Sequence, residues 1–253
     1  MFNLAPVPVS DLTGRVVLVT GAGKGIGAEL VRILVTNGAT VYAGVFPGEA
    51  AEDLPAAATV LRLDVTKQAD VDAALAQVQA ESGRLDVLVN NAGMIAPIGP
   101  LAELATDALA PAFAVNVMGV HRMALAALPM LRASQGVIVN AGTGAATTPM
   151  EGWTVYCSTK AAMRMLTQMM AMELAPDVKS FFVGIPPTDT AMQGVIRSAG
   201  LNPISKIPQE KLVRPAVPAS VLAWMCGAEA RAVDEVLLDV RQEIFTKMMD
   251  LPA

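Results

Sequence analysis

Short apolar runs without polar alternation recur along the chain, and helical patterns follow most of them. Such runs are typical of strands that are buried on both faces of a sheet. They predict strands at residues 15–20, 39–45, 59–63, 84–90, 136–141, 180–185 and 235–240. Helices are predicted at residues 67–81, 106–132, 153–175 and 218–228, after a first helix that ends at Asn37-Gly38.

Strands and helices alternate to the end of the sequence, with no linker-like change in composition and no internal repeat. This order predicts an α/β fold, a single doubly wound and mostly parallel sheet of about seven strands with helices on both faces. We therefore expect one domain over residues 1–253. Ligands of such sheets bind beyond the carboxyl ends of the strands, so the loops after the strands are the expected place for chemistry.

Composition restricts the partners and the location. Apolar residues make up 53% of the chain, so some apolar surface is expected to be buried between subunits. The net charge is −5 and no basic run is present, which argues against nucleic acid and anionic membranes. The most apolar stretch, residues 112–131, is interrupted by His121, Arg122 and Pro129, so no membrane span is expected. Because the first residues lack the basic start of a secretory signal, the expected location is cytoplasmic.

Residues that commonly bind metals are scarce. Cys157 and Cys226 have no metal-ligand spacing, and His121 is the only histidine. No metal site is therefore predicted, and His121 is expected to be a packed or capping residue.

The first predicted strand leads into the glycine-rich sequence TGAGKGIG at residues 20–27. Gly21, Gly25 and Gly27 would let the backbone turn tightly and approach a pyrophosphate at the N-terminus of the following helix. The same glycines could serve only a structural turn. The loop alone leaves both roles open.

A second candidate is TVYCSTKAAM at residues 154–163, which places Tyr156 four positions before Lys160 on a predicted helix. Residues at this spacing share a helix face. The pair could be a core aromatic beside a surface lysine, or a proton-transfer unit. The stretch itself does not decide between them.

Together, the glycine-rich loop, the sequence NNAG at residues 90–93 and the Tyr156/Lys160 pair resemble the short-chain dehydrogenase/reductase family. The resemblance extends from about Gly14 to Val240, with the motifs in family order. It implies a Rossmann-type catalytic domain and an NAD(P)(H)-dependent oxidoreductase. Such an enzyme interconverts a ketone or aldehyde with an alcohol by hydride transfer.

The resemblance implies four catalytic residues. Tyr156 would be the general acid/base, and Lys160 would lower its pKa together with the positive nicotinamide ring and hold the nicotinamide ribose. Asn116 would anchor a water in the proton relay, unless it only bonds backbone inside its helix. Thr143 stands where the family has a substrate-orienting serine. Its hydroxyl can make the same hydrogen bond, although the branched Cβ restricts its rotamers.

On the cofactor side, the resemblance implies that Asp64 and Val65 border adenine and that the segment after Asn90 lines the adenosine ribose. Asn90 itself could have a structural role in the sheet and not contact the cofactor. Beyond Pro186 the family's glycine is replaced, and either of two threonines could reach the carboxamide or phosphates. The full set of expected cofactor-binding residues is Gly21, Lys24, Gly25, Ile26, Gly27, Asp64, Val65, Asn91, Ala92, Gly93, Tyr156, Lys160, Pro186, Thr188 and Thr190.

The second strand ends in Val45-Phe46-Pro47, which offers neither a carboxylate for a ribose 2′-hydroxyl nor a base for a 2′-phosphate. Lys24, inside the glycine loop, lies where NADP-preferring relatives often carry a base. NADP(H) is therefore expected to be favoured, with NAD(H) possible. Lys24 could also be an ordinary exposed loop lysine.

Residues 188–214 lack a regular pattern and are expected to form a substrate lid, or else a subunit contact. Met94, Ile95, Met150 and Trp153 imply a small, mostly apolar carbonyl or alcohol substrate, and Arg197 could meet a carboxylate. The apolar long helices suggest a homodimer or homotetramer. Two alternatives stay open: a dinucleotide-binding sensor or partner subunit with little turnover, and a dehydratase or isomerase on the same scaffold.

Overall fold

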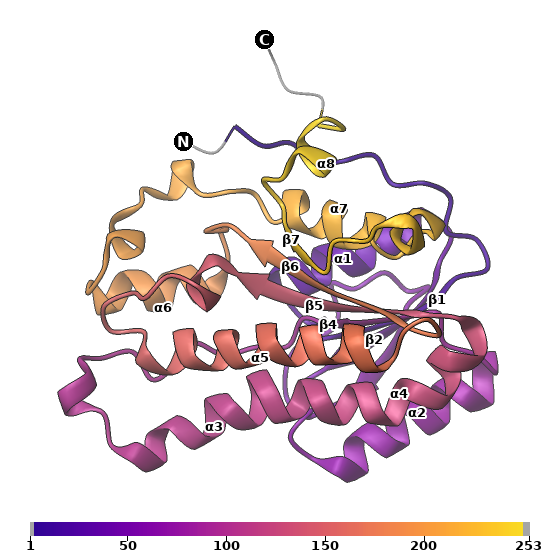
Figure 1. Ribbon diagram of the computed structural model, residues 1–253, viewed down its shortest axis with the longest axis horizontal. Helices are drawn as coiled ribbons and strands as arrows, with labels where there is room; N and C mark the ends of the chain where they lie inside the picture. The colour runs from indigo at the N-terminus through magenta and orange to yellow at the C-terminus, as the bar shows by residue number, and fades with distance from the viewer. Residues whose placement is uncertain (1–2, 250–253) are drawn as a thin grey trace.

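A computed structural model describes residues 3–249, so the two ends of the predicted domain lie outside the described residues. Its sheet has seven strands in the order β3-β2-β1-β4-β5-β6-β7, and every pair is parallel, as predicted (Figure 1). The strands are β1 (Val16–Thr20), β2 (Thr40–Val45), β3 (Thr59–Arg62), β4 (Val87–Asn90), β5 (Val137–Thr143), β6 (Lys179–Ile185) and β7 (Leu237–Asp239).

Helices cover both faces of this sheet. In Figure 1, α1 and α7 lie above it, whereas α2, α4 and α5 lie below it. The α-helices are α1 (Gly25–Thr36), α2 (Gln68–Ser82), α3 (Ala110–Phe113), α4 (Val120–Ser134), α5 (Thr154–Glu173), α6 (Ala191–Ala199), α7 (Ala216–Trp224) and α8 (Glu243–Thr246).

The apolar runs form strands because alternate side chains enter two different cores. Val17 and Val19 of β1 pack with Leu30 of α1 on one face. Leu18, between them, packs with Leu75 of α2 on the other face. Strand order reverses between β1 and β4, which opens the crevice where doubly wound sheets bind ligands.

The predicted long helix at residues 106–132 is confirmed, although its hydrogen-bond pattern is not uniform. A 3₁₀ turn (Thr106–Leu109) leads into α3, and a π-helical segment (Ala114–Gly119) joins α3 to α4. The combined helix, Thr106–Ser134, is long and apolar enough to cross a membrane by length and composition. In this fold Met123 and Leu131 are buried against the sheet. That no membrane partner exists stays a prediction.

The expected irregular stretch at residues 188–214 contains regular structure. It holds α6 and two 3₁₀ turns, Pro203–Lys206 and Gln209–Lys211. Helix α6 forms because Met192 and Ile196 share one face and turn toward an apolar cluster. It ends at Gly200, whose φ of 68° is readily adopted only by glycine.

Candidate active site

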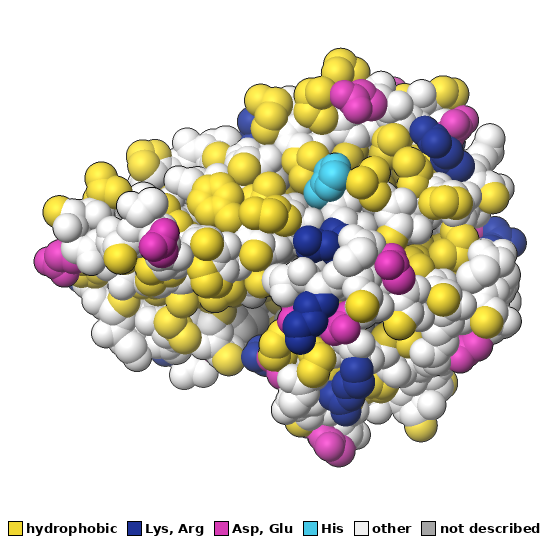
Figure 2. Space-filling view, turned by 90° about the horizontal axis from the view of Figure 1, so that it is seen from below, with side chains coloured by type: hydrophobic (Ala, Val, Ile, Leu, Met, Phe, Trp, Pro, Cys, Tyr) yellow, Lys and Arg dark blue, Asp and Glu magenta, His cyan; other side chains and the backbone are white. Residues whose placement is uncertain are grey.

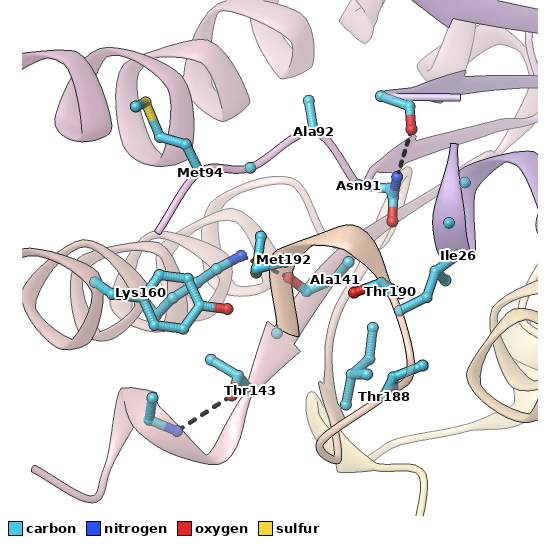
Figure 3. Close-up of a pocket in the computed structure, with 18 of the residues that line it drawn as sticks. Ile26, Asn91, Ala92, Met94, Ala141, Thr143, Lys160, Thr188, Thr190 and Met192 are labelled. Carbon is cyan, nitrogen blue, oxygen red and sulfur yellow. Dashed lines mark hydrogen bonds between the residues drawn. The ribbon is translucent and has the colours of Figure 1, made fainter. Parts of the chain in front are cut away.

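A cavity of about 570 Å³ opens at the carboxyl ends of the strands and runs from the glycine loop to α6. All the expected cofactor-binding residues line it, as do Thr143, Tyr156 and Lys160. Figure 3 shows Ile26, Asn91 and Thr190 at one end and Thr143, Lys160 and Met192 at the other. The loops after separate strands thus meet in one site, as the topology requires.

The glycine loop has the backbone that a pyrophosphate site needs. Gly21 and Gly25 have φ values of 63° and 56°, in the left-handed region. A Cβ at Gly27 would lie 2.2 Å from the Gly21 carbonyl oxygen, so no side chain fits there. Helix α1 begins at Gly25 and directs its first N–H groups toward this loop. The loop therefore fits a dinucleotide phosphate, and not only a turn.

Asn91 holds this loop in place. Its side-chain Nδ2 donates to the carbonyl oxygens of Thr20 (3.1 Å) and Gly21 (2.9 Å). Asn90 instead donates to Asn140 at 2.9 Å inside the sheet, which confirms the structural alternative for Asn90. Asn91 thus acts on the cofactor site through the loop.

Asp64 is a buried carboxylate that stays ionised. Burial opposes its ionisation, but hydrogen bonds from the Thr66 hydroxyl (2.7 Å) and backbone N–H (2.9 Å), with Lys67, lower its pKa overall. The carboxylate lies beside Val65 in the cavity wall. An acceptor at this place fits an adenine amino group.

Lys24 forms an ion pair that the sequence did not predict. Its Nζ lies 2.5 Å from Glu49 Oε1. The loop that carries Glu49 is tied to β3, because Arg62 Nη1 donates to the Glu49 carbonyl oxygen at 2.7 Å. Both Lys24 and Glu49 line the cavity, whereas the Val45 side chain is fully buried. Glu49, four positions beyond β2, is therefore the acidic residue of the cavity wall that pairs with Lys24.

The threonines after β6 have separate surroundings. The Thr188 hydroxyl donates to the Pro186 carbonyl oxygen at 2.7 Å. Thr190 precedes α6 and faces the glycine loop, since its Cγ2 lies 3.3 Å from a Cβ built at Gly25. Thr190 is thus the better placed of the two for a phosphate, and Thr188 shapes the turn.

Tyr156, Thr143 and Lys160 form the other end of the cavity. The Tyr156 ring is buried and packs edge-on against Trp153, with 5.6 Å between ring centroids. Thr143, at the end of β5, lies near enough to the Tyr156 hydroxyl to lower its pKa, and its Oγ1 accepts from the Ala145 N–H at 3.3 Å. Lys160 Nζ donates to the Ala141 carbonyl oxygen at 2.9 Å. The proposed acid and its orienting hydroxyl therefore face the same end of the cavity.

The lowering of the Tyr156 pKa by Lys160 together with the nicotinamide ring stays a prediction, and the protein's own surroundings act in the other direction. Burial raises the pKa of Tyr156 to about 12, and the neighbouring Cys157 adds to this, while the Thr143 hydroxyl opposes it. Burial also lowers the pKa of Lys160 to about 8. Lys160 Nζ lies 5.8 Å from the Tyr156 ring centroid, so desolvation of the hydroxyl outweighs its charge.

Asn116 is fully buried behind the cavity, in the π-helical segment. Its Nδ2 donates to the Met94 carbonyl oxygen (2.8 Å) and to Thr159 Oγ1 (2.9 Å), and its Oδ1 accepts from the Met94 N–H (2.9 Å). A single-turn π segment is frequent at functional sites. The Asn116 side chain therefore fixes the wall beside Gly93, and its water-anchoring role stays a prediction.

The substrate end is mostly apolar. Met94, Met150 and Trp153 line it, whereas Ile95 packs behind the wall. The apolar residues of the predicted lid have three different surroundings. Met192, Ile196 and Ile204 line the cavity, Leu201 packs on Gly152, and Val195 is exposed.

Sequence reasoning missed two charged residues of the cavity wall, Glu49 and Arg241. Arg197, suggested as a carboxylate anchor, is exposed on α6 and does not line the cavity. Arg241 directly follows the last predicted strand, at a strand end where chemistry is expected, and this was the available signal. Among residues 3–249, no three His, Cys, Asp or Glu side chains are grouped as metal ligands would be.

Comparison with known proteins agrees with this geometry. The family model described as short chain dehydrogenase matches residues 15–200. The chain belongs to the short-chain dehydrogenase/reductase family. L-fucose dehydrogenase of Oryctolagus cuniculus is 36% identical over 163 residues, which cover 63% of this chain but only 57% of that protein. L-xylulose reductase of Mus musculus is 40% identical over 167 residues, covering 65% of this chain and 68% of that protein.

A solved short-chain dehydrogenase/reductase structure shares the fold. It is the 3-ketoacyl-(acyl-carrier-protein) reductase from Brucella melitensis complexed with NADH, at a TM-score of 0.80 and 28% identity. The aligned region covers 90% of this chain and 97% of the reductase. These findings confirm the Rossmann-type fold and an NAD(P)(H)-dependent oxidoreductase that interconverts alcohols and carbonyl compounds. They favour the enzyme over the dinucleotide-binding sensor.

Proposed function

We propose that this protein reduces a small, mostly apolar ketone or aldehyde to its alcohol with Tyr156 as the proton donor. The observation that carries the proposal is that Tyr156 and Thr143 line the apolar end of the same cavity that begins at the glycine loop. When bound, the nicotinamide supplies the hydride.

The protein's own residues have separate roles in this proposal. The Thr143 and Tyr156 hydroxyls together would hold the substrate oxygen, and Tyr156 would then donate its proton to that oxygen. Lys160 would hold a ribose hydroxyl from its fixed position on the Ala141 carbonyl. The apolar residues of α6 would exclude water from the reacting carbonyl.

The reductive direction follows from the state of Tyr156. Burial raises its pKa to about 12, so the phenol is protonated at neutral pH and can act as an acid. An alcohol oxidation would need the phenolate, which this burial disfavours. Reduction is therefore the direction for which Tyr156 already has the required protonation state at neutral pH.

For the dinucleotide, we propose that NADP(H) is favoured only weakly and that NAD(H) is also accepted. Lys24 attracts a 2′-phosphate, but its pairing with Glu49 offsets that attraction. The Glu49 carboxylate can also accept from a ribose 2′-hydroxyl. Two opposed charges on an exposed loop leave a difference of less than about tenfold.

A reduction screen tests the proposed reaction. Aryl and alkyl ketones, diketones and acyl thioesters are mixed with the purified protein and either NADH or NADPH, and absorbance at the nicotinamide band is followed. We expect consumption of the reduced cofactor with at least one apolar ketone class. Binding of both dinucleotides without turnover across the panel would support the sensor instead. Substrate consumption with unchanged nicotinamide absorbance would support a dehydratase or isomerase.

We further propose that the protein is a homodimer or homotetramer. Large apolar side chains are exposed on α5 and on the π segment with α4: Met118, Leu125, Met165, Met169 and Met172. Figure 2 shows apolar side chains around the single histidine, His121, on this side of the molecule. Met163 and Met170, also on α5, are instead buried against the sheet and are not available for a subunit contact.

Sedimentation velocity at micromolar concentration tests the assembly. The native protein is expected to sediment as a dimer or tetramer, and Leu125→Glu should shift it toward the monomer because a charge would be buried in the contact. Val195→Glu places the same charge on an exposed apolar residue of α6 and should leave the assembly unchanged. A monomeric native protein would exclude this proposal.

A further inference from the structure

Gln193 is a polar side chain at the apolar end of the cavity. It lies on α6, lines the cavity and is only 3% exposed. Met192 and Ile196 of the same helix also line the cavity, and both pack in the apolar cluster that contains Tyr156. Gln193 and Ile196 share a helix face, because they lie three positions apart. The small surface that Gln193 exposes therefore belongs to the wall of the substrate end.

A hydrogen bond fixes the Gln193 amide and leaves its oxygen free. Nε2 donates to the Ile204 carbonyl oxygen at 3.0 Å. Because only the nitrogen of a side-chain amide can donate, this contact also determines which end of the amide is the oxygen. Among residues 3–249, no donor reaches Gln193 Oε1. The amide oxygen is thus an acceptor whose bonding capacity is unused.

The turn that holds the amide is itself anchored. Ile204, which accepts from Gln193, lines the cavity and follows Asn202. Asn202 Oδ1 accepts from the Ile204 N–H at 3.1 Å, and Asn202 Nδ2 donates to the Glu151 carbonyl oxygen at 3.0 Å. Glu151 lies two positions before Trp153. The amide is therefore held between α6 and the loop before α5, and a ligand need not order it.

An unpaired acceptor in an apolar wall favours a ligand that supplies a donor. The wall around it consists of apolar and aromatic residues: Ala145, Met150, Trp153, Met192, Ile196 and Ile204. A buried amide oxygen without a donor is unfavourable, and a ligand donor removes this cost. Ketone, ester and carboxylate oxygens only accept, whereas a hydroxyl donates. The chamber thus matches an apolar molecule that carries a hydroxyl.

We propose that Gln193 is a specificity-determining residue whose Oε1 accepts from a substrate hydroxyl, so the preferred substrates are hydroxy ketones with an apolar body. This inference rests on the proposed reduction. Ile196, less than one helical turn from Gln193, packs in the cluster with Tyr156, so the hydroxyl and the ketone should lie close together. The contact is one neutral hydrogen bond, and its loss should lower affinity about tenfold.

Two pairs of ketones test this contact, because in each pair a methyl group replaces the hydroxyl. They are 2-hydroxyacetophenone with propiophenone, and 3-hydroxypropiophenone with butyrophenone. Calorimetric titration into Tyr156→Phe protein saturated with NADH measures their affinity without turnover. At least one hydroxy ketone should bind about tenfold more tightly than its alkyl partner. Gln193→Met, which keeps the length of the side chain, should remove this preference and leave the alkyl ketone nearly unchanged.

Asn202→Ala is the matched control for a purely structural role. It removes two hydrogen bonds that hold the turn with Ile204, but Asn202 does not line the cavity. This control should retain the preference for the hydroxyl. If Gln193→Met and Asn202→Ala both weaken hydroxy and alkyl ketones equally, Gln193 only holds the turn and the proposal is overturned. Weaker NADH binding in Gln193→Met would assign the amide to the dinucleotide and would also overturn it.

Steady-state reduction of both pairs by protein with native Tyr156 separates failure of this inference from failure of the reaction. If the titrations show a hydroxyl preference that depends on Gln193 but no ketone is reduced, Gln193 binds the hydroxyl and the proposed reaction is wrong. If the alkyl ketones are reduced and neither pair shows a hydroxyl preference, the reaction stands and the role of Gln193 is wrong.

Discussion

Replacing Tyr156 with phenylalanine is expected to lower carbonyl reduction about a hundred- to ten-thousandfold, the usual contribution of a positioned proton donor. The substitution removes only the hydroxyl. The ring keeps its edge-on contact with Trp153, so the fold should be retained. Lys160 is held by the Ala141 carbonyl, so dinucleotide affinity should hardly change. Steady-state kinetics and a dinucleotide titration measure the two effects separately.

Tyr42 provides a matched control, because it is the second of the two tyrosines. It is buried, and its hydroxyl lies 2.8 Å from Ser82 Oγ, away from the cavity. Tyr42→Phe removes the same atom and should keep nearly full activity. Full activity in Tyr156→Phe would refute the mechanism. Loss of both turnover and dinucleotide binding would instead indicate a structural role for the tyrosine.

Tyr156 also determines how the rates of carbonyl reduction and alcohol oxidation depend on pH. Burial raises the pKa of Tyr156 to about 12, so the proton donor is present throughout the neutral range. Reduction should therefore be insensitive to this group from about pH 6 to about pH 9. Oxidation of an alcohol needs the phenolate, and its rate should rise with pH as that fraction grows. A reduction rate that falls with an apparent pKa near neutrality would assign proton donation to another group.

The strands and their parallel order could be predicted because a buried parallel strand has a local signature. The apolar run Val16–Thr20, for example, is buried along its whole length, and the pattern needs no knowledge of distant residues. The π segment could not be predicted in this way. Asn116 lies within it and bonds to Met94 and Thr159, which belong to other parts of the chain. The change from α- to π-helix thus occurs together with tertiary contacts, and the local apolar pattern carries no signal of it.

The residues of the site also differ in whether the sequence could predict them. The glycine loop and the Tyr156/Lys160 pair could be located because, with NNAG, they resemble the motifs of a known family in family order. The roles of Glu49 and Arg241 could not be predicted, because they depend on contacts with residues that are distant in the sequence. Glu49 neutralises Lys24 across 25 positions. Arg241 reaches the cavity only because β7 lies beside β6. Which charges in the cavity wall neutralise each other therefore depends on the folded structure and cannot be read from the sequence.

Charge reversal at Glu49 should therefore have a large effect on dinucleotide choice. Glu49→Lys removes repulsion of a 2′-phosphate and adds an attraction beside Lys24. With each exposed contact worth about 1 kcal/mol, the NADPH-to-NADH affinity ratio should rise about thirtyfold. Lys24→Ala should lower NADPH affinity and leave NADH almost unchanged. Titration of both reduced dinucleotides at low and high salt measures the ratio, and added salt should diminish each shift.

Glu52→Lys is the matched control. Glu52 lies in the same loop but is exposed and does not line the cavity, so the same change in net charge should alter the ratio less than about threefold. Val45 is a poor site for introducing a carboxylate, because its side chain is fully buried and the charge would destabilise the fold. If Lys24→Ala weakens both dinucleotides equally, Lys24 contacts the shared pyrophosphate. If Glu49→Lys and Glu52→Lys act alike, the effect is one of net charge, and Glu49 does not contact the 2′ position.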